Sequence, residues 1–589
     1  MCKQLFIYLL LFITYVLDGQ DLPRGFQGDE KVLMPSYLSA VTSYDGSVRS
    51  VEVPGPVRSM AEWEELQGLI ISWTNSFRDI QAEIVRNTIP QCKIIIACSN
   101  PASVKSFLAT KSINDSVNVH YVTGNYNSIW VRDYGPNSVY AFDVDSLYLV
   151  DWIYNRPRYQ DDTLARQLSR SLGLPLLETN KVPDDLVHTG GNYMSDGLGF
   201  AFSSLLVMDE NGPDNEFGLS NHSEAEVDSI MHRYMGTKTY VKMNTLPYDA
   251  IHHIDMHMKI LDEQNILVGK YENDVSDGAQ INANIDYILS SFKNTFGKPY
   301  QIHYVPMPPG PDGRYPYQNG DYRTYTNSVF VNRTVLVPFY EEKYDTVARN
   351  VYESLLPGYN IVGIDCNKII PSLGAIHCIT KEVGVTDPLM IAVDQAAPLI
   401  EVQNESERTI RAIVRNRSGI DQVWLYYQPD HVTGIWDSVR MDLISPDESM
   451  YSGVIPVFDS IAYYYVRAVA VSGKTISRPM TAPEGYFKTR AIRTSAVDQI
   501  QPSLSYINIY PNPAQAVTCI DLGIRNRHPL KVSLVDGQGR VAAKLHDGPW
   551  DVNQTRLFFD ASALPAGLYF VKIEGKGIFQ LKPVIVIHS

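Results

Sequence analysis

The chain has 589 residues, with 50 Lys and Arg against 65 Asp and Glu, which gives a formal charge of −15. This acidic balance excludes a general nucleic-acid binder, because neutralising phosphates requires clustered basic residues. Apolar residues make up 44% of the chain, which excludes wholesale disorder, and six cysteines are too few for a disulfide-stapled scaffold of this length.

The N-terminus is typical of an exported chain. Lys3 supplies a positive charge before an apolar run over residues 5–17, and the small residue Gly19 follows that run. The run is shorter than the roughly 20 apolar residues that cross a bilayer. We expect a signal peptide over residues 1–19, with a buried first helix as the alternative. Five cysteines follow residue 19, an odd number, so at least one is predicted to lack a partner within the chain.

Residues 20–394 predict a lead-in followed by one large domain. Residues 20–60 are punctuated by Pro and Gly and are expected to be extended. The short β-branched runs 68–73 and 93–98 predict buried strands. Helical spacing is found over residues 77–87, 161–172 and 282–296. This alternation predicts a mixed α/β domain over residues 61–394.

The last third of the chain changes to short alternating strands separated by turn residues. Strands such as 422–427 and 462–467 predict an all-β sandwich over residues 395–492. A second break precedes another β-only block over residues 503–589.

Two motifs of the α/β domain carry acids or histidines. In Trp130-Val-Arg-Asp-Tyr-Gly-Pro136, Asp133 sits at a Gly-Pro turn, where it is either a solvated carboxylate or a ligand-binding one. Read as a strand, residues 251–257 place His253, Asp255 and His257 on one face. That face could bind a metal, transfer a proton beside a charge-holding Asp, or be a polar strand edge.

Three further motifs are ambiguous when each is taken alone. Cys378 in Gly374-Ala-Ile-His-Cys378 is either a small buried hydrophobe or a reactive thiol. Asn327 leads from a turn into an apolar run. Arg156 and Arg158 flank Pro157, a spacing able to clamp one carboxylate or phosphate, although two solvated arginines would look the same.

In their order along the chain, these motifs together with Gly190-Gly-Asn192 resemble the guanidine-modifying amidinotransferase and deiminase superfamily. The closest branch is the Porphyromonas-type peptidylarginine deiminases, in the group shared with agmatine deiminases. The resemblance covers roughly residues 60–392. It implies an α/β fold in which the catalytic domain is a five-fold pseudosymmetric α/β propeller, followed here by two all-β sandwich domains.

The resemblance also implies roles for individual residues. Cys378 matches the nucleophile, His253 the general acid and base, and Asn327 an active-site asparagine. Asp133 and Asp255 match the two carboxylates that hold the substrate guanidinium. A thiolate would attack the guanidinium carbon, ammonia would leave, and water would release citrulline from a Cys-bound thiouronium. This cycle requires no cofactor and no metal.

Arg156 and Arg158 distinguish the branches, because free agmatine has no carboxylate for them to hold. The resemblance implies that they bind the α-carboxylate of a C-terminal arginine, while Trp130 lines the pocket beside the aliphatic stem. One departure is Thr189, which stands where relatives carry an acid before Gly-Gly-Asn. It weakens an agmatine assignment.

The C-terminal blocks carry further resemblances. Residues 395–492 look like an immunoglobulin-like domain. Residues 503–589 resemble the sorting domain of type IX secretion substrates, through Tyr510-Pro-Asn-Pro513, Asp536-Gly-Gln-Gly-Arg540 and Leu564-Pro-Ala-Gly-Leu-Tyr569. They imply a secreted or outer-membrane-attached hydrolase whose partners are the export machinery and peptides ending in arginine.

Three alternatives remain open from the sequence. The chain could deiminate free agmatine or arginine, it could be a catalytically silent surface adhesin, or it could be a metalloenzyme centred on His253, Asp255 and His257.

Overall fold

The computed structural model divides into two compact units, Met1–Ile492 and Arg493–Ser589. The residues that it describes are 22, 24–43, 51–114, 117–215, 221–395, 400–401, 407–429, 434–456, 458, 461–492, 504–524, 529–550, 555–575 and 578–588. The predicted signal peptide over residues 1–19 lies outside this set. Among the described residues, no helix has the length and apolar character needed to cross a membrane.

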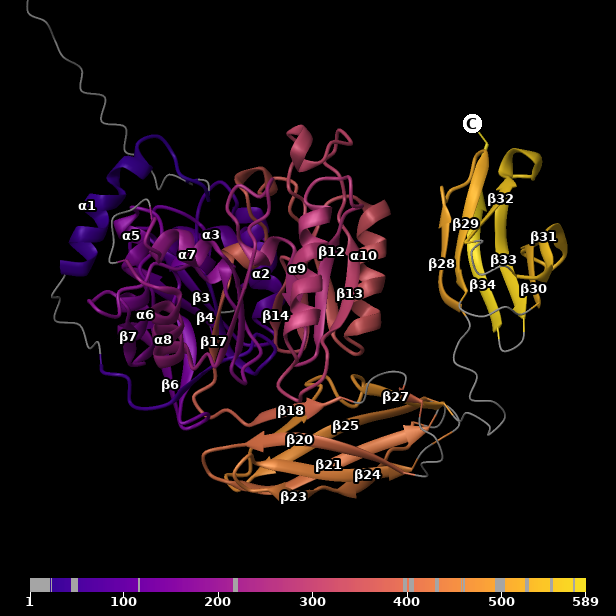
Figure 1. The fold of residues 1–589 in the computed structure, drawn as a ribbon. Coiled ribbons are helices and arrows are strands. Elements are labelled where there is room, and N and C mark those ends of the chain that lie inside the picture. The colour runs from indigo at the N-terminus through magenta and orange to yellow at the C-terminus, as the bar shows by residue number, and fades with distance from the viewer. Residues whose placement is uncertain are drawn as a thin grey trace, which may run out of the picture. The chain divides into compact units, whose positions relative to one another are not determined.

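Five separate small sheets form the α/β part of the first unit in the described chain (Figure 1). The first contains β1 (Val57–Ser59), β5 (Asn137–Ala141), β6 (Ser146–Asp151) and β7 (Leu176–Glu178). The second contains β8 (Met194–Ser195), β9 (Phe200–Ser204) and β10 (Thr239–Met243), and the third β11 (Met258–Ile260), β12 (Asn265–Lys270) and β13 (Gln301–Pro306). The fourth contains β14 (Val329–Val331), β15 (Thr334–Phe339) and β16 (Asn360–Asp365), and the fifth β2 (Leu66–Ser72), β3 (Lys93–Cys98), β4 (Val119–Thr123) and β17 (Lys381–Gly384).

Each of the five sheets combines an antiparallel pair with a parallel pair. In the fifth sheet β17 pairs with β2, so the last strand of this region lies beside one of its first. The predicted mixed α/β class is confirmed. The arrangement of the sheets about a five-fold axis stays a prediction.

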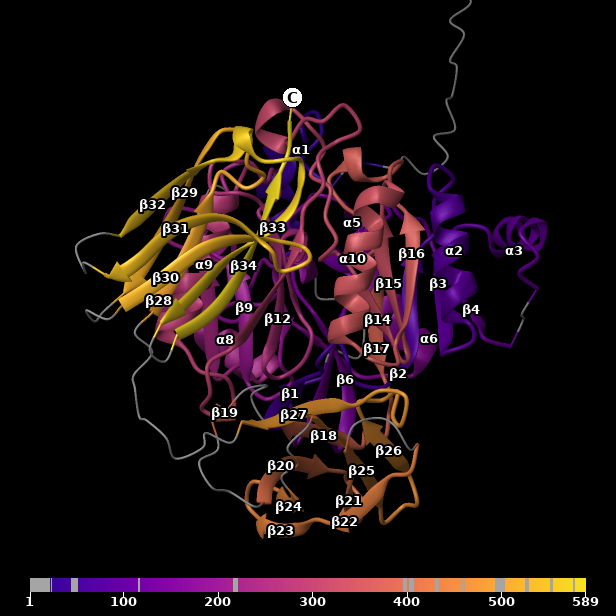
Figure 2. The same ribbon diagram turned by 90° about the vertical axis from the view of Figure 1, so that its right-hand side faces the viewer.

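Helices connect these strands, and α10 lies against β16 (Figure 2) and against β13 (Figure 1). They are α2 (Arg78–Thr88), α3 (Pro101–Thr110), α4 (Val131–Tyr134), α5 (Tyr159–Asp162), α6 (Leu164–Leu172), α7 (Leu206–Asn211), α8 (Glu224–Met235), α9 (Gly278–Ser291) and α10 (Glu342–Leu355). Short 3-10 turns are η1 (Gly190–Asn192), η2 (Ile254–Met256), η3 (Pro316–Gln318), η4 (Ile370–Ser372) and η5 (His377–Ile379).

The elements that the sequence analysis named in this part lie within a few residues of observed ones. The strand predicted over 93–98 is β3. The helix predicted over 161–172 is broken at Thr163 into α5 and α6. The helix predicted over 282–296 is shifted, because α9 begins at Gly278, one turn before its buried stripe, and the backbone becomes extended at Phe292.

The lead-in predicted to be extended over residues 20–60 contains a helix instead, α1 (Glu30–Ser43). Its buried residues have amphipathic-helix spacing, i, i+3, i+4 and i+7, and are Met34, Tyr37, Leu38 and Val41. They pack with Ile153 and Val187 of the α/β part. Pro35 lies inside the helix and, as a helix breaker, hid this spacing in the sequence.

The β-rich region of the first unit begins earlier than the predicted boundary at residue 394. β18 (Met390–Asp394) pairs with β20 (Glu407–Arg415) in a sheet that also holds β24 (Met450–Pro456) and β23 (Asp442–Ser445). The second sheet contains β19 (Ile400–Glu401), β27 (Phe487–Ile492), β25 (Ile461–Ala470), β21 (Ile420–Pro429), β22 (Asp437–Arg440) and β26 (Thr475–Arg478). One core joins both sheets and includes Leu389, Ile391 and Val393. The apolar run that ends the α/β sequence pattern therefore belongs to this region.

The second unit is also built of strands, with a core of its own. One sheet contains β28 (Leu504–Tyr510), β29 (Val517–Ile524) and β32 (Arg556–Asp560), and the other β31 (Val541–Pro549), β30 (Pro529–Asp536), β33 (Gly567–Gly575) and β34 (Ile578–Val586). The turn η6 (Ala561–Ala563) follows β32. The sandwich and immunoglobulin-like assignments of these two β regions stay predictions.

Candidate active site

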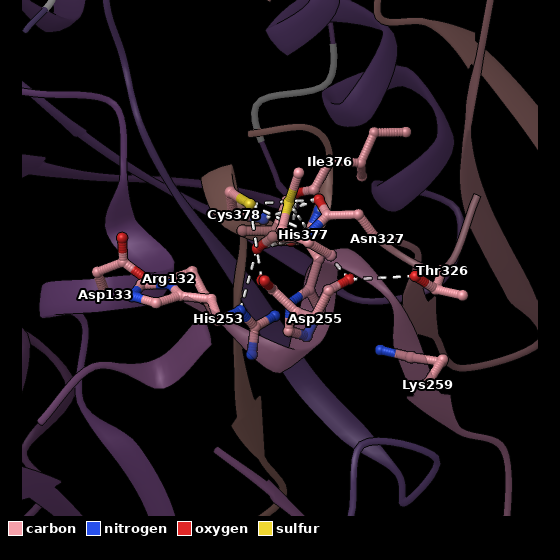
Figure 3. A network of polar contacts seen from close by, with 12 residues as sticks. Arg132, Asp133, His253, Asp255, Lys259, Thr326, Asn327, Ile376, His377 and Cys378 are labelled. Atoms are coloured by element: carbon pink, nitrogen blue, oxygen red, sulfur yellow. Dashed lines mark hydrogen bonds and ion pairs between the residues drawn. The ribbon is translucent and has the colours of Figure 1, made fainter. Parts of the chain in front are cut away.

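The predicted site residues come from segments that precede four of the five sheets of the α/β part. Asp133 lies on α4 before β5, and Asp255 lies on η2 before β11, with His253 directly before that turn. Asn327 precedes β14, and Cys378 lies on η5 before β17. The segment before β8, which belongs to the remaining sheet, contains Thr189 and the turn η1. All of these side chains are buried, and Figure 3 shows the acids, His253, Asn327 and Cys378 in one cluster.

A guanidinium group of the chain itself fills the space between these residues. Arg24 donates from Nε and Nη2 to the two oxygens of Asp133, at 2.7 and 2.8 Å. Its Nη2 also lies 2.5 Å from His253 Nδ1 and 3.5 Å from Asp255 Oδ2. Its Nη1 donates to Cys378 Sγ. Two carboxylates, a histidine and a thiol therefore converge on one planar cation.

Cys378 is positioned by Asn327. The amide Nδ2 of Asn327 donates to Cys378 Sγ at 3.1 Å, while its Oδ1 accepts from the backbone N–H of His377 and of Cys378 at 3.0 and 3.3 Å. Burial raises the pKa of the Cys378 thiol, the Arg24 cation opposes that shift, and the charges of Asp255 and Asp133 add to it. None of the five described cysteines forms a disulfide. The odd number of cysteines had predicted that at least one would lack a partner within the chain.

Asp255 is held as an anion from both sides. Its Oδ2 bonds to His377 Nδ1 at 2.9 Å. Burial alone would raise the pKa of Asp255, but Arg24 and the hydrogen bond from His377 outweigh burial and hold it below its ordinary value.

Behind Asp255, the site is supported by a network of buried ion pairs. The sequence analysis did not reveal this network. His377 Nε2 lies 3.0 Å from Glu62, which also pairs with Lys259. Arg132 makes a two-pronged pair with Glu382 at 2.8 and 2.7 Å and donates to the backbone oxygen of His377. Arg132 and His377 each stand next to a predicted residue in the motifs quoted above, and that adjacency was the available signal.

The metal alternative does not fit the described residues. The prediction of a strand over residues 251–257 is wrong, because the backbone turns through η2 between His253 and His257. Among the described residues, these two histidines form no three-ligand cluster with Asp255. One cluster of suitable geometry occurs in the described chain, Glu62 with His377 and Glu382. Its two carboxylates already pair with Lys259 and Arg132.

Thr189 and the glycines after it shape the pocket. Thr189 Oγ1 lies 3.1 Å from His253 Nε2, so the residue that departs from the family pattern orients the histidine. A Cβ at Gly191 would collide with Arg24 Nη2 and would lie 2.6 Å from His253 Nδ1. Only glycine leaves room there for a bound guanidinium.

The three predicted substrate-binding residues hold the backbone around Arg24. Trp130 Nε1 donates to Leu22 O at 2.7 Å, and Arg156 Nε donates to Arg24 O at 3.1 Å. Arg158 pairs with Glu30 at 2.8 Å and donates to the backbone oxygen of Gly25. The two arginines therefore bind neighbouring groups of one segment instead of clamping a single carboxylate.

Replacing Arg24 with alanine should raise the pKa of His253. Burial and then the Arg24 charge hold that pKa well below its ordinary value. Removing the cation removes the second effect and favours the imidazolium form. An NMR titration of the histidine ring signals measures the change. The matched control is His303 on β13, whose pKa is lowered by burial and opposed by Asp262, and whose titration should stay in place. A lowered or unchanged His253 pKa would contradict this electrostatic account.

Curated relatives of similar sequence are named as agmatine deiminases. One from Legionella pneumophila (strain Paris) is 26% identical over 276 residues, which is 45% of this chain and 75% of the relative. One from Streptococcus mutans is 23% identical over 329 residues, 51% of this chain and 86% of the relative.

Solved structures give a similar result at lower identity. Agmatine deiminase of C. jejuni is 20% identical, covering 55% of this chain and 95% of its own, with a TM-score of 0.46. Agmatine deiminase of Enterococcus faecalis is 18% identical, covering 56% and 98%, with a TM-score of 0.47.

Two family models match the chain directly. The model of the secretion system C-terminal sorting domain matches residues 508–587, which indicates secretion or attachment at the outer-membrane surface. The model of the Porphyromonas-type peptidyl-arginine deiminases matches residues 58–383, more than half of the chain. Members of this family are hydrolases that act on C–N bonds of amidines, so the enzyme class predicted from the motifs is confirmed. The chain belongs to the Porphyromonas-type peptidyl-arginine deiminase family.

Proposed function

We propose that the protein is a secreted deiminase that converts peptidyl arginine, preferably at a C-terminus, to citrulline and ammonia. One observation carries this proposal: an arginine side chain within a polypeptide lies in the pocket, contacting Asp133, Asp255, His253 and Cys378. Agmatine, on which the similar proteins are named to act, remains the alternative substrate.

The carboxylate pair provides recognition. A guanidinium is resonance-stabilised and cationic, and moving it out of water is costly unless anions compensate its charge. Asp133 meets Nε and Nη2 in a two-pronged geometry that fixes the plane of the group, and Asp255 adds charge on Nη2. Such a site selects a planar cation with several donors over an ammonium.

Cys378 acts as the nucleophile in this proposal. Its sulfur attacks the central carbon, and the C–N bond to one terminal nitrogen breaks, which leaves a thiouronium on the enzyme. Water then attacks the same carbon, the C–S bond breaks, and a ureido group leaves as citrulline. The net reaction consumes one water and releases one ammonia.

His253 carries the protons of both steps. Its Nδ1 faces Nη2 of the bound guanidinium, so we assign Nη2 as the departing nitrogen. The proton lost by the thiol reaches Nη2 through His253, and in the second step the histidine accepts a proton from water. Thr189, at the opposite ring nitrogen, keeps the imidazole in this orientation.

Arg156 gives the preference for a terminal arginine. It donates to the backbone oxygen of Arg24, the position that one carboxylate oxygen of a C-terminal arginine would take. The neighbouring Arg158 adds a second positive charge. A full negative charge binds these donors more strongly than a neutral carbonyl.

The wider architecture fits this proposal. Each of the five sheets is preceded by a segment that reaches the pocket, which supports a five-fold pseudosymmetric propeller as the catalytic domain. The sorting domain supports export, with a signal peptide over residues 1–19 as the entry to that route.

Replacing Cys378 with alanine should lower ammonia release from a peptide ending in arginine by a factor of at least about 10³, because no other group supplies the nucleophile. Ammonia is measured with a coupled assay. Cys92, whose thiol pKa burial raises to about 12, is the matched control, and Cys92→Ala should keep wild-type activity. An unchanged rate in Cys378→Ala would reject the mechanism, and absence of ammonia from every guanidine tested would favour a silent adhesin.

Arg156→Ala should separate the two substrate classes. Loss of a charge-assisted contact to the carboxylate should lower kcat/KM for a C-terminal-arginine peptide roughly 10- to 100-fold. Agmatine has no carboxylate, so its kcat/KM should change little. The control is Arg233→Ala, which removes a half-exposed arginine on α8. Equal losses for both substrates would show that Arg156 does not read the carboxylate.

Gly191→Ala should lower kcat/KM roughly 100-fold for any guanidine substrate, because the added methyl displaces the guanidinium from its reacting position. Gly537→Ala, where a Cβ meets nothing within 4 Å, is the control and should behave like wild type. Near-normal kinetics in Gly191→Ala would show that substrates bind elsewhere than Arg24 does.

A further inference from the structure

The segment formed by residues 22 and 24–43, which we call the N-terminal segment, lies in the candidate active site as a substrate would. The Arg24 side chain is 1% exposed and contacts the four groups assigned above to guanidinium recognition and chemistry, which are Asp133, Asp255, His253 and Cys378. No free guanidine could enter the pocket while Arg24 is there, because the Gly191 wall leaves no spare volume around Nη2.

The backbone on both sides of Arg24 is held as well. Before Arg24, the oxygen of Leu22 accepts from Trp130. The N–H of Arg24 donates to Ser372 O at 3.3 Å. After Arg24, the oxygen of Gly25 accepts from Arg158, and the centroid of the Phe26 ring lies 4.1 Å from the guanidinium carbon of Arg156. The surface beside the pocket therefore accommodates a chain that continues past the arginine.

Helix α1 anchors the segment at a distance from the chemistry. Its Glu30 forms an ion pair with Arg158, and its buried face closes over Ile153 and Val187. Apolar burial of this kind is independent of the guanidinium contacts, so it holds the segment even where substrate competes for the pocket.

The docked arrangement is that of an inhibitor. Hydrolysis needs water at the guanidinium carbon after the sulfur has added, yet Arg24 and Cys378 are both buried under the segment. Contacts on both sides of Arg24 oppose the movement that would admit water.

We propose that the N-terminal segment is an intramolecular inhibitor whose Arg24 occupies the guanidinium pocket, so that the enzyme is latent while the segment is docked. This inference rests on the proposed function for the identity of the pocket. A tethered ligand faces its site at an effective concentration on the order of 1 mM. If the free segment bound with a Kd on the order of 0.1 mM, the pocket would be filled in about nine of ten molecules.

Two variants of the full chain test this proposal. Arg24→Ala empties the pocket directly. Met34→Asp places a charge in the buried face of α1 and leaves every pocket residue unchanged. Both should raise kcat/KM for agmatine and for an arginine peptide about tenfold, while the control Arg233→Ala stays at the wild-type value. Because the two substitutions act at separate places, Met34→Asp decides the question if Arg24→Ala fails to fold.

A second readout does not depend on turnover. Chloroacetamidine carries an amidinium that fits the carboxylate pair and an electrophilic carbon for the thiol. Its alkylation of Cys378, located by mass spectrometry, should be about tenfold faster in both variants than in wild type. A synthetic peptide of residues 20–43 should slow the alkylation of Met34→Asp, whose own segment no longer covers the site of α1, and the same peptide with alanine at position 24 should not.

Equal alkylation of Cys378 in wild type, Arg24→Ala and Met34→Asp would overturn the latency proposal, whether or not any guanidine is hydrolysed. Conversion of Arg24 to citrulline in wild type but not in Cys378→Ala would also overturn it, since the segment would then be a substrate. Failure of the proposed function has a different signature, namely faster alkylation in the variants with no ammonia from any guanidine.

Discussion

The burial of two carboxylates around one small volume is the constraint on which the catalytic region depends. Asp133 and Asp255 are almost fully shielded from solvent, and two anions so placed are stable only with a cation between them. The Arg24 guanidinium meets that requirement in this structure, and a substrate guanidinium would meet it in turnover. The ion pairs of Arg132 and Lys259 with Glu382 and Glu62 continue the same alternation of charge behind the pocket.

Short turns convert this electrostatic requirement into geometry. Asp133, Asp255 and Cys378 each lie on a single turn of helix just before a strand, and the strands belong to three different sheets. A turn fixed by the following strand permits little rotation, which suits side chains that must stay within about 0.5 Å of their productive positions. Asn327 reinforces the turn of Cys378 through two backbone N–H groups.

The sequence predicted which side chains come together better than it predicted the backbone that brings them there. His253 and Asp255 were identified from a strand that does not exist, and both reach the pocket because the turn η2 brings them there. His377 escaped notice beside Cys378, since a motif shows which residues are adjacent but not which ones pair with a distant acid. Arg24 could not be found at all: its partners lie more than 100 residues away, and Pro35 masked the helix that anchors it.

The same cation that fills the pocket also acts on the pKa of Cys378, the proposed nucleophile. Burial and the two carboxylates hold the Cys378 pKa above its ordinary value, and a guanidinium beside the sulfur opposes them. A bound guanidinium therefore lowers the pKa of the Cys378 thiol relative to a site without a cation, and so shifts the thiol toward the thiolate form. Arg24 supplies that cation while it excludes substrate and water. If the segment leaves, substrate has to supply both the electrophile and the charge that activates the thiol.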